Sequence, residues 1–183
     1  ELRGHLMPVR GAAVSPTGDR IATGGGDNYL KVWDAATGQE VTNLMREHVG
    51  AVAWSADGKW LAGGGRDGRV IRYRLPSSPP AVLFPHAANV GTVAARPGGG
   101  AVTADPTGGV RVWDAAGGQS VGRFTVRPHD PGAARPQAVA GDGAPALAVS
   151  PNGETLAVGT GGGEVVLWDL AKRAERGRLA AHT

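Results

Sequence analysis

The chain has 183 residues with 31 glycines, 13 prolines and a formal net charge of only +3, a length that allows one domain with a sizeable core. It has no cysteine, which excludes disulfides and thiolate metal sites and suits a reducing compartment, so we expect a cytoplasmic protein. The sequence contains no run of 18 apolar residues that would predict a membrane span. Its arginines are scattered, which favours a solvated, mildly basic surface over a nucleic-acid-binding surface.

The first unit of the chain, about residues 4–44, predicts four short β-strands separated by turn residues. A proline and a glycine mark the first turn, because proline presets φ and glycine accepts a positive φ. In the third strand, Leu30 and Val32 alternate with residues of the opposite face, which include Trp33. The predicted strands are 9–15, 20–23, 30–33 and 40–44.

Three further units repeat this plan, at about residues 45–84, 85–124 and 145–183. The second unit has its predicted strands at 51–55, 60–62, 70–73 and 81–84. The third has them at 90–95, 101–103, 110–113 and 121–124. The fourth has them at 146–150, 155–159, 165–168 and 176–179. Short strands at regular spacing, with turn residues between them, predict an antiparallel all-β protein.

Each unit places one aromatic anchor at the same point of its third strand, and these anchors are Trp33, Tyr73, Trp113 and Trp168. One apolar residue stands three positions before each anchor, and another stands eleven positions after it. Two apolar columns in register across four units indicate a true repeat. The one irregular segment, about residues 127–144, is rich in proline, glycine and alanine, and we expect a projecting surface loop there.

The first unit resembles the WD-repeat (Trp-Asp repeat) β-propeller family, from Gly4-His5 through the glycine run to LKVWD, which ends at Asp34. The resemblance implies blades of four antiparallel strands that pack radially around a central channel. It covers nearly the whole chain outside residues 127–144. We therefore expect one domain, 1–183, that is a propeller or part of one.

The resemblance also implies a hydrogen-bond network, which would join His5, Thr23, Asp27 and Trp33. In such a network a carboxylate orients the imidazole, and the partly buried indole N–H finds an acceptor. Only the first unit carries all four residue types, since the second and fourth units have Gly63 and Val158 at the hydroxyl position and the third has Thr107 at the position of the turn acid. The repeat anchors of the later units are Tyr73, Trp113, Asp114, Trp168 and Asp169.

Three more specific kinds of site, namely a dinucleotide site, a metal site and a catalytic site, have less support in the sequence. The G-x-G-x-x-G run at residues 63–68 precedes a strand rather than a helix, so we interpret it as a hairpin turn and not as a dinucleotide site. Four of the five histidines stand near the start of a unit, which favours structural hydrogen bonds over a metal site. The chain lacks G-x-S-x-G, and its acids lie mostly in turns, so we expect no catalytic residues, no metal and no cofactor.

A rigid propeller that presents loops is expected to act as a scaffold for protein–protein interaction. The resemblance suggests Met7, Arg10 and Arg66 as contact residues, because such loop-proximal positions tend to lie on the family's partner-binding face. Trp60 is a further candidate with two open alternatives, exposure as a binding residue or packing against a neighbouring blade. The alternative functions are nucleic-acid binding and a regulatory or sensor module of a longer bacterial signalling protein, the source being suggested by the alanine, glycine and arginine content.

The closure of the propeller stays open at the level of sequence. An open stack exposes the apolar outer faces of its two end blades, which is a liability in solution. Three arrangements would cover them: further blades of a longer chain, a second copy that completes eight blades, or a closed ring of four. The predicted partners are therefore unidentified proteins and other blades, from the rest of a longer chain or from a second copy.

Overall fold

The computed structural model describes residues 1–44, 49–75, 81–83, 89–114, 119–126 and 145–180. Within these ranges the chain forms sixteen β-strands and one short 3-10 turn, η1 (Pro97–Gly99). The strands make four antiparallel sheets of four strands each. The predicted all-β fold, with one four-stranded blade for each unit of the sequence, is confirmed.

The strands of each sheet lie in chain order, and we number the sheets as blades 1 to 4. Blade 1 comprises β1 (Val9–Val14), β2 (Arg20–Gly25), β3 (Leu30–Asp34) and β4 (Glu40–Asn43). Blade 2 comprises β5 (Val49–Trp54), β6 (Trp60–Gly65), β7 (Val70–Arg74) and β8 (Ala81–Leu83). Blade 3 comprises β9 (Thr92–Ala95), β10 (Ala101–Ala104), β11 (Gly109–Trp113) and β12 (Ser120–Thr125). Blade 4 comprises β13 (Ala146–Val149), β14 (Thr155–Gly159), β15 (Glu164–Asp169) and β16 (Ala174–Ala180).

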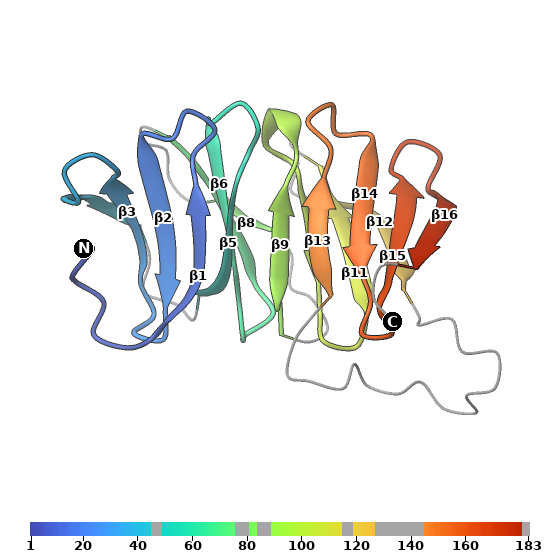
Figure 1. The fold of residues 1–183 in the computed structure, drawn as a ribbon, viewed down its shortest axis with the longest axis horizontal. Coiled ribbons are helices and arrows are strands. Elements are labelled where there is room, and N and C mark those ends of the chain that lie inside the picture. Colours follow the sequence, from blue (N-terminus) through green and yellow to red (C-terminus); the bar gives the residue numbers. More distant parts are fainter. Residues whose placement is uncertain (45–48, 76–80, 84–88, 115–118, 127–144, 181–183) are drawn as a thin grey trace.

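The first strands of successive blades lie side by side and form the inner edge of the stack. Strand β1 contacts β5, β5 contacts β9, and β9 contacts β13, while the fourth strand of each blade lies at the far edge of its sheet. Figure 1 shows the blades following one another from blade 1, beside the N-terminus, to blade 4, with a free blade face at each end. The sheets do not close on one another, so the alternative of a closed four-blade ring is wrong for this chain.

Antiparallel pairing gives every blade two chemically different faces. In blade 1, Trp33 pairs with Ile21, so both side chains lie on one face of the sheet. The next pair along, Val32 with Ala22, lies on the opposite face. We call the face that carries the aromatic anchor the anchor face, and the opposite one the counter face.

Each anchor face packs on the counter face of the blade before it. The hydroxyl group of Tyr73 in blade 2 donates to the carbonyl oxygen of Leu44 in blade 1 over 2.8 Å. Between blades 3 and 4, the rings of Phe124 and Trp168 stack with their centroids 4.0 Å apart. An anchor aromatic therefore meets the outer strand of the preceding blade, and this type of contact recurs along the stack.

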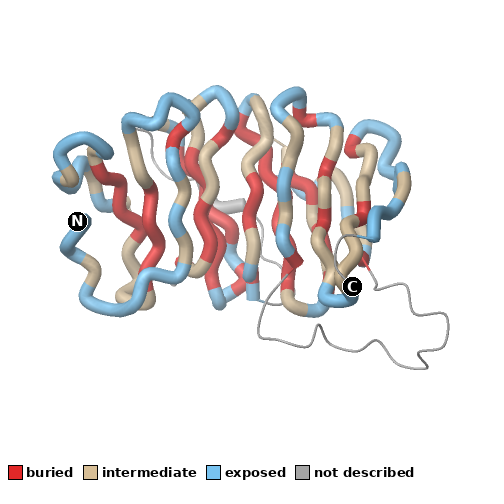
Figure 2. The backbone as a smooth tube through the Cα atoms, viewed as in Figure 1, coloured by how far each residue is buried: buried red, intermediate tan, exposed pale blue. Residues whose placement is uncertain are grey.

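The apolar core is divided among the three blade junctions of the described chain. Leu30, Val70 and Val110, on the counter faces, are each 0% exposed, and burying such a side chain contributes about 1.5–3 kcal/mol. Figure 2 shows buried segments along the strands and exposed segments in the turns. A Cβ atom on Gly24 would lie 2.7 Å from the Val49 side chain of blade 2, so glycine is required for this close approach of the two blades.

Some strand boundaries differ from the prediction because contacts between blades override local preference. Strands β2 and β6 continue to Gly25 and Gly65, whereas the glycine runs predicted an end near residues 23 and 62. Glycine weakens an isolated strand, but here it lets neighbouring blades approach. Strand β9 begins at Thr92 and β16 begins at Ala174, two residues later and two residues earlier than predicted. The predicted loop at residues 127–144 lies outside the described residues.

Candidate interaction surface

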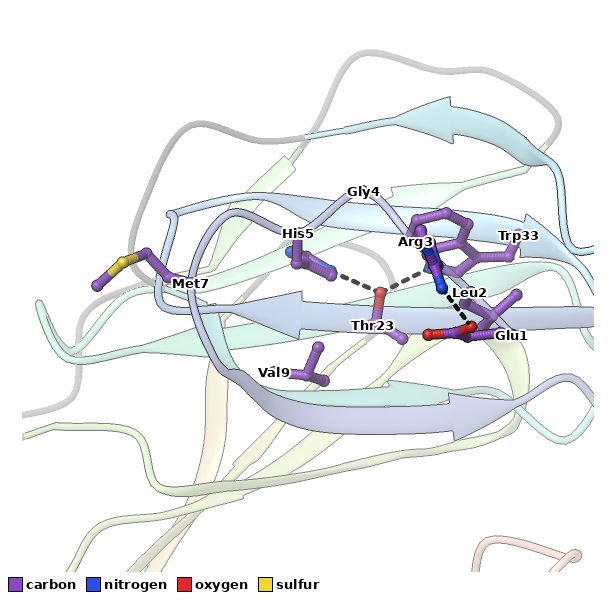
Figure 3. Close-up of a pocket in the computed structure, with 9 residues that line it drawn as sticks. All are labelled: Glu1, Leu2, Arg3, Gly4, His5, Met7, Val9, Thr23 and Trp33. Atoms are coloured by element: carbon purple, nitrogen blue, oxygen red, sulfur yellow. Dashed lines mark hydrogen bonds and ion pairs between the residues drawn. The ribbon is translucent and has the colours of Figure 1, made fainter.

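A polar cluster lies on the anchor face of blade 1, beneath the N-terminal residues (Figure 3). The indole N–H of Trp33 donates to the hydroxyl oxygen of Thr23 over 2.7 Å. The same hydroxyl oxygen lies 2.7 Å from Nε2 of His5, and Nδ1 of His5 lies 2.9 Å from the carboxylate of Asp27. These are the four residues that the sequence placed in one network.

The direction of the hydrogen bonds in this cluster follows from the carboxylate. Facing Asp27, the Nδ1 atom of His5 carries the proton and donates, which leaves Nε2 as the acceptor in the neutral ring. The Thr23 hydroxyl then donates to His5 and accepts from Trp33, so each group has a partner. Burial would raise the pKa of Asp27, but hydrogen bonds from the Leu6 amide and the His5 ring hold that pKa below its ordinary value.

A cavity of about 380 Å³ lies beside this cluster. The residues that line it are Glu1, Leu2, Arg3, Gly4, His5, Met7, Val9, Thr23 and Trp33. Figure 3 shows His5 and Trp33 turned toward Thr23, while Met7 points away from the network. Because the imidazole and the hydroxyl are already used in hydrogen bonds, the arrangement indicates a structural role and offers no free acid–base pair.

The anchors of the later blades are held by other contacts. In blade 3, the indole N–H of Trp113 donates to Thr103 over 2.8 Å. Asp114 and Asp169 accept backbone amides from the chain that follows them, so these acids stabilise the turns after the third strands. The histidines of the later units lie outside the described residues. The full four-residue network is therefore described for blade 1 alone.

A smaller cavity, about 80 Å³, lies between blades 1 and 2. It is at the end of the strands where the turns between the second and third strands lie. We call it the arginine cleft, and it is lined by Arg10, Gly25, Gly26, Asn28, Val49, Gly50 and Arg66. Arg10 lies at an irregularity of β1 and Arg66 lies in the turn after β6, and both are exposed. Within the described residues neither guanidinium has an ion-pair partner, and no acidic residue lines the cleft.

Exposed apolar side chains border the arginine cleft. Leu6 and Met7 are both exposed, and Met7 lies next to Gly26, which lines the cleft. A Cβ atom on Gly26 would lie 3.4 Å from Cβ of Met7 and 3.5 Å from Nε of Arg10. Three predicted contact residues, Met7, Arg10 and Arg66, thus border one cleft. Leu6 was missed because it precedes the first strand, where no periodic pattern marks it.

Trp60 lies at the opposite end of β6 and packs between blades 2 and 3. The guanidinium of Arg72 lies 4.4 Å from the centre of the Trp60 ring and donates to the Gly99 carbonyl over 3.0 Å. A Cβ atom on Gly99 would lie 2.6 Å from the Trp60 ring. Of the two alternatives for Trp60, the structure favours packing against the neighbouring blade. Arg72 was missed because it is a charged residue in an otherwise apolar column.

Two other expectations concern metal ions and nucleotides. In the part of the chain that the structure describes, no group of three or more His, Asp or Glu side chains is placed to hold a metal ion. The glycine run at residues 63–68 lies in β6 and the hairpin turn that follows it, where the Gly68 amide donates to the Gly65 carbonyl. Among the described residues no helix is long and apolar enough to cross a membrane.

Comparison with known proteins agrees with this architecture. A family model described as "WD domain, G-beta repeat" matches residues 1–34, 38–73 and 141–169, together more than half of the chain. Blade 3 lies outside these matches. A solved structure titled "Structure of U3-55K" superposes with a TM-score of 0.78 at 20% sequence identity, over 100% of this chain and 54% of that one. At that identity the likeness shows the fold alone.

Three curated relatives illustrate the sequence similarity. Protein hir1 of Emericella nidulans is 38% identical over 95 residues, which are 46% of this chain and 9% of that protein. Serine-threonine kinase receptor-associated protein of Gallus gallus is 33% identical over 90 residues, 48% of this chain and 26% of that protein. Ribosome biogenesis protein ERB1 of Chaetomium globosum is 44% identical over 55 residues, 28% of this chain and 7% of that protein. The chain thus spans about a quarter or less of these relatives, and all three are eukaryotic, so the expected bacterial source is not supported.

Proposed function

The chain belongs to the WD-repeat family, and on that premise we propose that residues 1–183 act as one non-catalytic platform that binds other proteins at one end of its blades. The printed name of one relative describes a receptor-associated protein, which fits a binding role. Short strands that share apolar layers hold the turns in fixed positions, so a partner meets a preorganised surface.

The observation that carries this proposal is the arginine cleft with its apolar border. A guanidinium group forms two parallel charge-assisted hydrogen bonds with a carboxylate, and Arg10 and Arg66 are free to do so within the described structure. Arginine and methionine are enriched at protein interfaces, and Met7 lies beside Arg10. These groups fit a protein surface that carries acidic and apolar side chains together.

The proposed partner presents an extended acidic segment. A cleft of about 80 Å³ accommodates a side-chain carboxylate rather than a folded domain. Glycines at residues 25, 26 and 50 leave the backbone of the cleft open to a peptide. Leu6 and Met7 would then contact an apolar residue next to the acid.

A peptide-display selection with the intact chain tests this proposal. We expect selected peptides to contain Asp or Glu next to Leu, Ile or Phe. Replacing both cleft arginines, in the variant Arg10→Glu/Arg66→Glu, removes two exposed ion pairs of up to about 1 kcal/mol each and adds repulsion, so affinity should fall about tenfold or more. The matched control is Arg123→Glu, an exposed arginine on the outer strand of blade 3.

Selected peptides without acidic enrichment, or equal affinity of the cleft variant and the control, would refute the proposed cleft. Nucleic-acid binding is the competing outcome and is measured in parallel with a labelled DNA duplex and a labelled RNA strand. Binding that weakens steeply with added salt and survives competition by the acidic peptides would favour that alternative, because phosphate contacts release counterions.

A further inference from the structure

Three polar side chains line the arginine cleft, and they are Arg10, Asn28 and Arg66. In the register of the four sheets, each of them stands where the other blades carry glycine or proline. The cleft is therefore a place where blades 1 and 2 depart from the repeat, although all four blades form the same strands. The corresponding residues of the other blades are Gly50, Gly91 and Pro145 for Arg10, Gly68, Gly108 and Gly163 for Asn28, and Gly26, Pro106 and Gly161 for Arg66.

The turn between the second and third strands does not require a polar residue. Its hydrogen bond is the same in blades 1 and 2, where the amides of Asn28 and Gly68 each donate over 3.1 Å to the carbonyl oxygen three residues earlier. The φ angle of Asn28 is 72°, in the left-handed region, and that of Gly68 is 77°. Glycine adopts this region with less strain than asparagine. Asparagine thus stands at a position that favours glycine, and what it adds there is a polar side chain at the cleft.

An irregularity of β1 sets the direction of Arg10. Its neighbours Val9 and Gly11 pair with two consecutive residues of β2, so Arg10 is the extra residue of a β-bulge. A bulge takes a side chain out of the alternation of its strand and re-aims it. Arg10 lines the cleft from blade 1, while Arg66 lines it from the turn after β6 in blade 2. The two arginines therefore enter one cleft from different blades.

Two guanidinium groups in one cleft favour a ligand group with two negative charges. Among the described residues no acidic side chain lines the cleft. A carboxylate has one charge and two oxygen atoms, which a single guanidinium group satisfies in a bidentate pair. A phosphate monoester carries about −1.5 to −2 charges at neutral pH and three acceptor oxygens, so it can bind both guanidinium groups at once. The side-chain amide of Asn28 offers further N–H donors. A cleft of about 80 Å³ has room for one such group and not for two acidic side chains.

We propose that Arg10, Asn28 and Arg66 bind the phosphate group of a phosphorylated side chain in the partner segment, so that phosphorylation of the partner raises its affinity for the cleft. The inference rests on the proposed function, because it names the acidic group that the cleft takes. A carboxylate engages one guanidinium group, and the other stays in water. A phosphate monoester engages both and accepts a further hydrogen bond from the Asn28 amide, while Leu6 and Met7 contact the apolar residue beside it.

A peptide pool with one fixed phosphoserine and varied neighbours, selected on the intact chain, supplies the probe. The selected peptide is then made again with glutamate and with serine in place of phosphoserine, and the three dissociation constants are measured by fluorescence anisotropy. We expect the phosphoserine peptide to bind at least about fivefold more tightly than the glutamate peptide, because it gains a second exposed ion pair. The serine peptide should bind more weakly than both.

The outcomes separate this inference from the proposed function. Equal affinities of the phosphoserine and glutamate peptides, both lost in Arg10→Glu/Arg66→Glu, would overturn this inference and leave the proposed function intact. Equal affinities of all three peptides, unaffected by that variant, would overturn both. Inorganic phosphate and a labelled RNA strand are added as competitors. Displacement of the phosphoserine peptide by either one, at a concentration equal to that of the peptide, would also overturn the inference, because the phosphate group would then be recognised without its protein segment.

Three glycine variants identify the side chains, because each restores a residue that another blade carries at the same position. Arg10→Gly and Arg66→Gly should each reduce the preference for phosphoserine over glutamate to about twofold or less, since one guanidinium group then serves either ligand. Asn28→Gly should weaken binding of the phosphoserine peptide without lowering the melting temperature, since glycine suits the left-handed φ. The matched control, Arg123→Gly at an exposed position of an outer strand, should keep the full preference. A preference for phosphoserine that survives both arginine variants would overturn the assignment.

Discussion

Replacing Thr23 by valine should destabilise the chain more than the same substitution at an exposed threonine such as Thr37. Valine keeps the shape of the side chain but removes the hydroxyl that accepts from Trp33 and donates to His5. The Trp33 side chain is only 2% exposed, so its N–H finds no water in exchange. An unsatisfied buried donor costs about 1–3 kcal/mol, and with the His5 bond also lost we expect the free energy of unfolding to fall by about 2–4 kcal/mol.

Urea denaturation followed by tryptophan fluorescence, at one fixed protein concentration, measures this loss. Thr37→Val removes a hydroxyl that donates to Asp34 in an exposed turn, so it should cost less than Thr23→Val. Thr23→Ser keeps the hydroxyl and should retain most of the stability. If Thr23→Ser were as harmful as Thr23→Val, the methyl group rather than the hydroxyl would be responsible, and the reasoning about the network would be refuted.

Three further predictions concern other contacts. Hydrogen bonds lower the pKa of Asp27 from 3.8, so its contribution to stability is full above that pH and is lost as the pH falls through the lowered value. Between about pH 5 and pH 3 the wild type should therefore lose more free energy of unfolding than Asp27→Asn. Parallel curves of unfolding free energy against pH for the two proteins would contradict this. Gly99→Ala places a Cβ atom 2.6 Å from the Trp60 ring, whereas the Cβ atom of Gly98→Ala meets nothing within 4 Å. Both glycines have a positive φ, so the melting temperature should fall further for Gly99→Ala than for Gly98→Ala. Equal falls in melting temperature would show that backbone strain alone matters. Phe124→Ala removes a ring stacked at 4.0 Å and should cost about 2 kcal/mol in urea denaturation, while an unchanged midpoint would show that the stack contributes nothing.

The blade architecture could be predicted because its signal is local and repeated. Alternation around Trp33 gave the third strand of blade 1, and the anchors at Tyr73, Trp113 and Trp168 placed the same strand in each later unit. Strand ends at the glycine runs could not be predicted, since the benefit of glycine appears only when a neighbouring blade approaches. Gly24 is the clear example, because its hydrogen leaves room for a residue 25 positions further along the chain.

The sequence predicted individual contact residues of the interaction surface, but it could not predict that these residues lie together at one cleft. Arg10 and Arg66 come from different blades, and their convergence on one cleft depends on how blade 1 packs on blade 2. Trp60 shows the reverse problem, because a large aromatic residue near a turn has the same sequence signature whether it binds a partner or a neighbouring blade. Its contact with Gly99 decides the matter, and that contact depends on tertiary packing.

Because the two faces of each blade differ, the stack of blades has a direction, with an anchor face at one end and a counter face at the other. The anchor faces carry the aromatic anchors and the counter faces carry aliphatic side chains such as Leu30, Val70 and Val110. A blade turned back to front would set two anchor faces together at one junction and two counter faces together at the other. A substitution on the counter face of a blade therefore acts on the blade that follows it, whereas one on the anchor face acts on the blade that precedes it.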